Sequence, residues 1–169
     1  MLEKELLELI HQGEGVTVEF KKSTHEITKD VYDTVCSFSN RNGGHIFLGV
    51  RDDGTIKGIS ADAVERMKKD FVTSINNAQK IYPPLYLNPE QYMIEGKIIL
   101  YIHVPSGSQV CRRHGRIFDR NNESDIDITD STDMVYQLYA KKSSSYFVNK
   151  VTGFGLEDLF QRLHSKICY

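Results

Sequence analysis

Apolar residues recur with a helical period in four stretches of the chain, and each stretch predicts an amphipathic helix. The predicted helices span residues 2–12, 28–41, 60–80 and 132–141. Glycine or proline follows closely after the first three, and neither residue type favours the continuation of a helix. Each of these helices is therefore expected to bury one apolar face.

Short apolar runs between the helices predict β-strands. Residues 16–20 alternate apolar and polar side chains, and residues 45–50 form the continuous run that is typical of a buried strand. Glycine-containing turns predict hairpins at residues 51–54 (with a returning strand at 55–59), 95–96 and 114–115. Interleaved helices and strands of this kind predict an α+β fold, a mixed sheet with packed helices and C-terminal hairpins.

The strand at residues 16–20 is expected to separate apolar from charged side chains. Its alternation directs Val16, Val18 and Phe20 toward the core. Glu19 and Lys21 then share the opposite face, where a solvated strand surface is the simplest interpretation.

The composition indicates a globular protein without a membrane anchor. The 169 residues are 40% apolar and 26% charged, and no run of about 18 apolar residues predicts a transmembrane helix. The chain begins with an acidic amphipathic stretch, which is unlike a signal peptide. One domain is expected over residues 1–142, followed by a tail with a short helix over residues 143–169 that begins in a serine-rich, linker-like stretch.

Cysteine usage predicts a reducing, cytoplasmic environment. The three cysteines lie at positions 36, 111 and 168, and no two form a CxxC pair. Widely spaced cysteines in odd number do not form a disulfide framework. We therefore expect Cys36 to be a buried spacer and the other two to be free thiols.

Charge is distributed unevenly although the net charge is only −2. Residues 105–122 contain four arginines and one aspartate, whereas residues 123–133 contain five acidic residues and no basic one. Cations on neighbouring strands and loops are suited to neutralising phosphates. The candidate nucleic-acid contacts are Lys21, Lys22, Arg112, Arg113, Arg116 and Arg120.

Several common motifs are absent or incomplete. The loop "GVRDDGT" has threonine where a phosphate-binding loop requires lysine. The six histidines form no pair with zinc-ligand spacing. Residues 119–130 resemble a calcium loop in acidic spacing but lack its central glycine and final glutamate. No ATP, zinc or calcium site is therefore predicted.

The order of the segments "VEFKKS", "TVCSFSNRNGGHIFLGVRDDGTIKGI" and "GKIILYIHVPSGS" resembles the Schlafen AlbA_2 family over about residues 5–140. The resemblance implies an AlbA-like α+β domain. It also implies nucleic acid, DNA or RNA, as a partner, because such domains occur in bacterial transcriptional regulators and RecG-related helicase-like proteins. The sequence departs from the family pattern at "VCRRHGRIFDRNNESD", which keeps Arg120 but lacks the usual proline–tyrosine step.

The same resemblance implies a set of candidate catalytic and metal-binding carboxylates. Eukaryotic Schlafen nucleases use two glutamates and one aspartate to hold a metal ion, and the matching positions are Glu14, Glu19 and Asp52, with Asp53 as an alternate. Clustered carboxylates hold Mg²⁺ or Mn²⁺, which polarises a phosphate and activates water. Gly15 allows a turn or bulge that would bring Glu14 to the same face as Glu19.

Three functional hypotheses follow. The first is a non-catalytic nucleic-acid (DNA) binding domain of a bacterial transcriptional regulator, without a cofactor. The second is a metal-dependent endoribonuclease that uses Mg²⁺ or Mn²⁺. The third is a protein-interaction or homodimerisation module whose surface includes the C-terminal residues Phe154, Leu156, Leu159 and Phe160.

Overall fold

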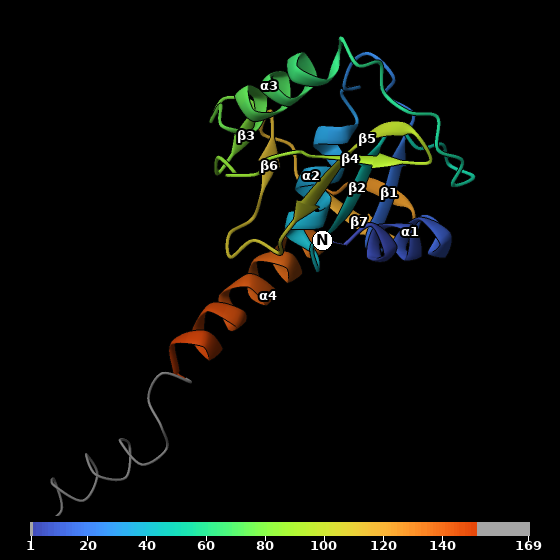
Figure 1. Ribbon diagram of the computed structural model, residues 1–169. Helices are drawn as coiled ribbons and strands as arrows, with labels where there is room; N and C mark the ends of the chain where they lie inside the picture. Colours follow the sequence, from blue (N-terminus) through green and yellow to red (C-terminus); the bar gives the residue numbers. More distant parts are fainter. Residues whose placement is uncertain (1, 152–169) are drawn as a thin grey trace, which may run out of the picture.

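The computed structural model describes residues 2–151, which form an α+β domain (Figure 1). The helices of this described part are α1 (Glu3–Gln12), α2 (Val31–Asn40), α3 (Val64–Ile75) and α4 (Thr132–Val151). Its strands are β1 (Val18–Lys21), β2 (Gly44–Leu48), β3 (Ile81–Tyr82), β4 (Glu90–Ile94), β5 (Lys97–Val104), β6 (Arg112–Arg113), β7 (Phe118–Asn121) and β8 (Ser124–Asp127).

A mixed sheet of four strands forms the centre of the domain. The strand order is β1-β2-β5-β4, with β1 parallel to β2 and the other neighbours antiparallel. Two small antiparallel ribbons, β3–β6 and β7–β8, lie outside this sheet. The predicted fold class, a mixed sheet with packed helices and additional hairpins, is confirmed.

Helices cover both faces of the central sheet. On one face α2 and α3 pack against β2 and β5, and the contacts include Phe38, Phe71 and Leu100. On the other face α1 contributes Leu6 and Ile10 to a second cluster that contains β1 side chains. Alternate residues of β2 and β5 therefore enter different clusters, as the alternation of side chains in a strand requires.

The double glycine before β2 is required by close packing. A Cβ atom on Gly43, which has a φ of +77°, would lie 2.6 Å from the carbonyl oxygen of Val104. A Cβ atom on Gly44 would lie 2.5 Å from the ring of Phe38 on α2. A larger residue at Gly43 would strike the backbone at the end of β5, and one at Gly44 would strike α2, which explains the two consecutive glycines between α2 and β2.

The structure corrects the predicted start of the first strand. Strand β1 begins at Val18, because the amide of Gly15 donates a hydrogen bond to the Val18 carbonyl and closes a loop before the strand. Val16 lies in that loop and is 45% exposed, so its predicted place in the core is wrong. Val18 and Phe20 are buried as predicted.

The predicted hairpins have three different outcomes. The hairpin at Glu95-Gly96 is confirmed, and it joins β4 to β5. Residues 55–59 form no returning strand and contribute a single bridge to residue 50. At His114-Gly115 the chain makes the expected tight turn, which a single antiparallel bridge between Arg113 and Arg116 closes, while β6 forms its ribbon with β3.

The last two elements differ from the predictions in extent. Strands β7 and β8 form a hairpin, which no turn signal in the sequence analysis predicts, in the stretch that resembles a calcium loop in acidic spacing. Helix α4 begins at the predicted Thr132 but continues to Val151, through the stretch predicted to be a linker. The predicted tail helix and its apolar residues at 154–160 lie outside the described residues. Within residues 2–151, no helix has the length and apolar content to cross a membrane.

Candidate functional site

Glu14 folds back onto β1. Its carboxylate accepts a hydrogen bond of 2.8 Å from the backbone amide of Phe20. Burial raises the pKa of Glu14, and although the Phe20 amide opposes this shift, the nearby charges of Glu19 and Asp52 add to it. Glu14 thus lies close enough to Glu19 and to Asp52 for their charges to raise its pKa.

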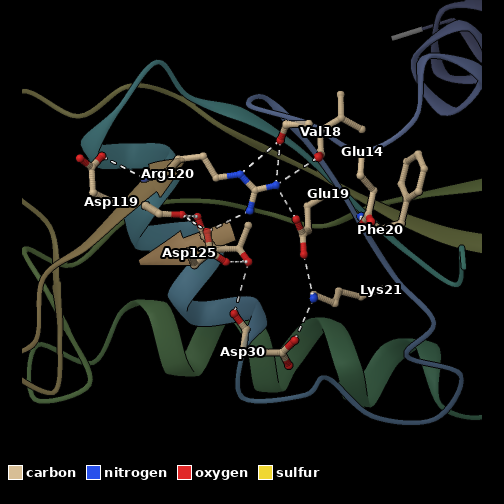
Figure 2. Close-up of polar contacts among 12 residues, drawn as sticks. Glu14, Val18, Glu19, Phe20, Lys21, Asp30, Asp119, Arg120 and Asp125 are labelled. Atoms are coloured by element: carbon tan, nitrogen blue, oxygen red, sulfur yellow. Dashed lines mark hydrogen bonds and ion pairs between the residues drawn. The ribbon is translucent and has the colours of Figure 1, made fainter. Parts of the chain in front are cut away.

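Arg120 on β7 connects this region to a buried ionic network (Figure 2). Its guanidinium lies 2.6 Å from Glu19 and 3.0 Å from Asp125, measured between nitrogen and carboxylate oxygen. It also donates a hydrogen bond of 2.8 Å to the carbonyl of Gly15 and lies over the ring of Phe38. The side chain of Arg120 has 0% exposure. Its charge is therefore held inside the protein and is not presented to a phosphate at the surface.

Helix α2 completes the surroundings of Asp125. The hydroxyl of Thr34 donates a hydrogen bond of 2.5 Å to its carboxylate, and the hydroxyl of Ser37 donates a second, short one. Thr34 and Ser37 are separated by three residues, so both point from the same face of the helix. Asp125 is compensated by one cation and two neutral donors.

Lys21 closes the network on the other side of Glu19. Its ammonium lies 2.7 Å from Glu19 and 2.9 Å from Asp30 (Figure 2). Burial alone would lower the pKa of Lys21, but hydrogen bonds with the two carboxylates raise it above the ordinary value. Burial would raise the pKa of Asp30, whereas hydrogen bonds with Thr28 and Lys21 lower it overall. Each carboxylate oxygen of Glu19 thus already contacts one cation, since Arg120 occupies the other.

Most of the predicted basic residues form ion pairs with carboxylates. The pairs are Lys21 with Glu19 and Asp30, Arg113 with Asp33, Arg116 with Asp127, and Arg120 with Glu19 and Asp125. Among the described residues, Lys22 and Arg112 form no ion pair, and Lys22 lies exposed just after β1. Of the six predicted nucleic-acid contacts, four are therefore neutralised by carboxylates, and Lys22 and Arg112 are not paired within the described part of the chain.

Arg112 lies at the edge of a cavity between the β3–β6 ribbon and α4. It is the register partner of Tyr82, and its guanidinium donates a hydrogen bond of 2.5 Å to the hydroxyl of Tyr139. Tyr82 is 59% exposed and Tyr139 is 40% exposed. The cavity has a volume of about 540 Å³ and is lined by Tyr82, Ser108, Gln109, Val110, Arg112, Tyr139, Lys142 and Ser143.

Lys142 contributes a second cation to this cavity. Its ammonium donates hydrogen bonds of 2.8 Å and 2.6 Å to the carbonyls of Ser39 and Gly107. Burial, with the neighbouring charge of Lys141, lowers the pKa of Lys142 to about 8. The side chain therefore stays mainly protonated at neutral pH.

A family model described as "Schlafen, AlbA_2" matches residues 14–129, which include β1, the double glycine and the β7–β8 hairpin. The chain belongs to the Schlafen AlbA_2 family. No curated protein matches the sequence.

Two solved structures are similar to this AlbA_2 chain. One is the DIP2311 protein from Corynebacterium diphtheriae, with 18% identity, a TM-score of 0.49, and coverage of 66% of this chain and 25% of that one. The other is the N-terminal domain of a RecG-related protein from Nitrosomonas europaea, with 20% identity, a TM-score of 0.43, and coverage of 60% of this chain and 71% of that one. This chain thus spans about a quarter of the first protein.

The metal ion of Schlafen nucleases does not fit the carboxylates of this AlbA_2 domain. No group of three or more histidine, cysteine, aspartate or glutamate residues in the described part of the chain is placed to hold a metal ion. Glu19 is the central member of the predicted triad, and both of its oxygens already contact cations. A divalent ion would have to displace Lys21 or Arg120. The carboxylates of the buried network therefore form ion pairs with Lys21 and Arg120.

The turn after β2 holds the third predicted carboxylate. Asp52 is exposed there, and the alternate, Asp53, accepts a hydrogen bond of 2.8 Å from the amide of Thr55. Gly54 has a φ of +80°, a conformation that favours glycine. Asp53 and Gly54 thus have the roles expected in a tight turn.

Several residues of these two sites do not stand out in the sequence. The network depends on Asp30 and Asp125, and the cavity depends on Tyr82, Tyr139 and Lys142. One signal was available, since the acidic run directly follows the arginine-rich run. A hairpin that joins the arginine-rich run to the acidic run brings their side chains together, and the register of β7 and β8 places Arg120 opposite Asp125.

Proposed function

We propose that the described domain binds single-stranded nucleic acid at the cavity formed by the β3–β6 ribbon and α4. The observation that carries this proposal is the position of Arg112, a cation without an ion-pair partner among the described residues, next to the exposed rings of Tyr82 and Tyr139. Cations and aromatic rings in one groove are the two features that non-specific single-strand binding requires.

The charge at this site supports contact with phosphates. Arg112 presents a guanidinium, whose fork of donors matches phosphate oxygens. Lys142 also lines the cavity, but its buried ammonium donates hydrogen bonds to the carbonyls of Ser39 and Gly107, so it adds positive potential and not a direct phosphate contact. Contacts of this kind release counterions and do not read base identity, so binding is expected to be sensitive to salt and largely independent of sequence.

The tyrosines support a preference for unpaired bases. A ring can stack on a base face only where the base is not enclosed in a duplex. The cavity volume of about 540 Å³ lies within the range of about 300–1,000 Å³ that is common for ligand sites. One base can therefore enter while its phosphate remains at Arg112.

This binding would serve a regulatory protein without catalysis by the domain itself. The family resemblance is the support for a role in transcription, and DNA is the partner that this role implies. The neutralisation of Glu19 by Lys21 and Arg120 supports the absence of a metal-dependent nuclease activity. Incubation of structured RNA with the protein and Mn²⁺ tests this part of the proposal, and cleavage that Glu19→Gln abolishes would contradict it.

Fluorescence anisotropy with labelled single-stranded DNA and RNA, and with a duplex of the same sequence, tests the binding site. We expect Arg112→Ala to weaken single-strand binding about tenfold and to reduce the salt slope by about 0.7, the value for one phosphate contact on a single strand. Arg116→Ala is the matched control. It removes the same charge from the same turn, but Arg116 is already paired with Asp127.

The two variants separate a local contact from a general charge effect. Circular dichroism should show that both remain folded. Equal weakening by Arg112→Ala and Arg116→Ala would contradict the proposed site, as would tighter binding of the duplex than of the single strand. A preference for DNA over RNA in the same titrations identifies the natural partner.

A further inference from the structure

Two cysteines that are 75 residues apart in the sequence meet in the core. The sulfur atoms of Cys36 and Cys111 are 2.8 Å apart, and both residues have 0% exposure. Cys36 lies on α2, and Cys111 directly precedes β6. Both are free cysteines, and among the described residues neither belongs to a group of histidine, cysteine, aspartate or glutamate side chains that is placed to hold a metal ion.

The backbone around Cys111 is already fixed to α2. The side-chain amide of Asn40 donates a hydrogen bond of 3.0 Å to the carbonyl of Cys111 and accepts one of 2.7 Å from its amide. Asn40 lies four residues after Cys36, so both side chains leave α2 on the same face. A disulfide bond has a length of about 2.05 Å. The sulfurs would therefore need to approach by about 0.8 Å from their present 2.8 Å.

We propose that Cys36 and Cys111 form a dithiol oxidation site, which becomes an intramolecular disulfide bond when a two-electron oxidant such as a hydroperoxide reaches it. One sulfur attacks a peroxide oxygen, which breaks the O–O bond and leaves a sulfenic acid and one water molecule. The second sulfur then attacks the sulfenic sulfur and expels its hydroxyl as a second water. The two thiols lose two electrons and two protons, and one hydrogen peroxide is reduced to two waters.

The site is built for slow oxidation. The hydrogen bond between the two cysteines and their burial raise the pKa of Cys36, which keeps it in the unreactive thiol form at neutral pH. Oxidation should therefore accelerate as the pH rises. Because the bond would be buried, reduction should also be slow. The disulfide ties the segment that carries Arg112 to α2, so it fixes the position of this residue independently of whether the domain binds nucleic acid.

Counting free thiols before and after oxidation tests the proposal. The full chain is treated with hydrogen peroxide, denatured, and blocked with N-ethylmaleimide, and its intact mass is measured. We expect three blocked thiols before oxidation and one afterwards, with a linked peptide pair that contains Cys36 and Cys111. The Cys168→Ser variant is the control, and it should form the same link and leave no free thiol. Denaturation before blocking removes the effect of burial on the count.

The test does not depend on a core variant that folds, because the wild-type peptide map identifies the link directly. Oxidised protein should also unfold at a higher urea concentration than reduced protein, since the bond closes a long loop of the unfolded chain. Dithiothreitol should reverse this shift after prolonged treatment. Three thiols that remain free after oxidation, or a link that involves Cys168 instead, would overturn the proposal.

Discussion

The substitution Arg120→Met tests whether this buried guanidinium holds the domain together. Methionine keeps much of the packing volume and removes the charge, which leaves Glu19 and Asp125 without their common cation. Removing one partner of a buried ion pair costs about 3–5 kcal/mol. Glu19 retains Lys21, and Asp125 retains two hydroxyl donors from α2. We therefore expect a loss near the lower end, about 3 kcal/mol in the free energy of unfolding.

Urea unfolding followed by circular dichroism measures this loss through linear extrapolation. Arg116→Met is the matched control, since it removes an exposed ion pair from the same region. An exposed pair contributes about 0–1 kcal/mol. A loss for Arg120→Met that is no larger than the loss for Arg116→Met would refute the structural role of the network.

Three further predictions concern other parts of the molecule. The pKa of Asp30 is lowered below its ordinary value of 3.8 in the folded chain. The ionised carboxylate therefore stabilises the fold at pH values above 3.8, and this contribution disappears as the pH falls through the folded-state pKa. Asp30→Asn should therefore lose less thermal stability than the wild type between about pH 5 and pH 2, and an equal loss would contradict the linkage. Gly44→Ala should lower the free energy of unfolding in urea by about 1–3 kcal/mol because its Cβ would strike the ring of Phe38. Gly15→Ala is the control: no atom lies within 4 Å of its Cβ, so this free energy should change by less than about 0.5 kcal/mol. Tyr82→Ala should weaken single-strand binding by about 1–3 kcal/mol in the anisotropy assay and leave duplex binding unchanged, while equal losses would argue against stacking.

Local periodicity was sufficient to predict the helical core. Val35 and Phe38 on α2, and Met67 and Phe71 on α3, are buried at the positions that helical spacing predicts. These predictions succeed because the period of a helix depends on neighbouring residues alone. The error at Val16 has a different origin, since a backbone hydrogen bond between Gly15 and Val18 ends the alternation before the strand begins.

The ionic network could not be predicted from local patterns. Arg120 and Glu19 are 101 residues apart, so their contact depends on how the β7–β8 hairpin packs beside β1. The alternation of β1 correctly places Glu19 and Lys21 on a face opposite to Phe20, but it does not reveal that this face is covered. Periodicity identifies the polar side of a strand, whereas burial of that side depends on elements that are distant in sequence.

The covered face of β1 also explains why a count of basic residues is a poor guide to binding in this chain. A buried carboxylate must be paired, because an isolated charge is too costly to remove from water. Glu19 and Asp125 thus require the cations that the sequence offers as phosphate contacts, Lys21 and Arg120. Removing one partner of such a pair is costly, but the paired charges themselves add little surface potential. The relevant quantity for binding is the set of cations that remain after internal pairing, and Arg112 is the member of that set that lies beside exposed aromatic rings.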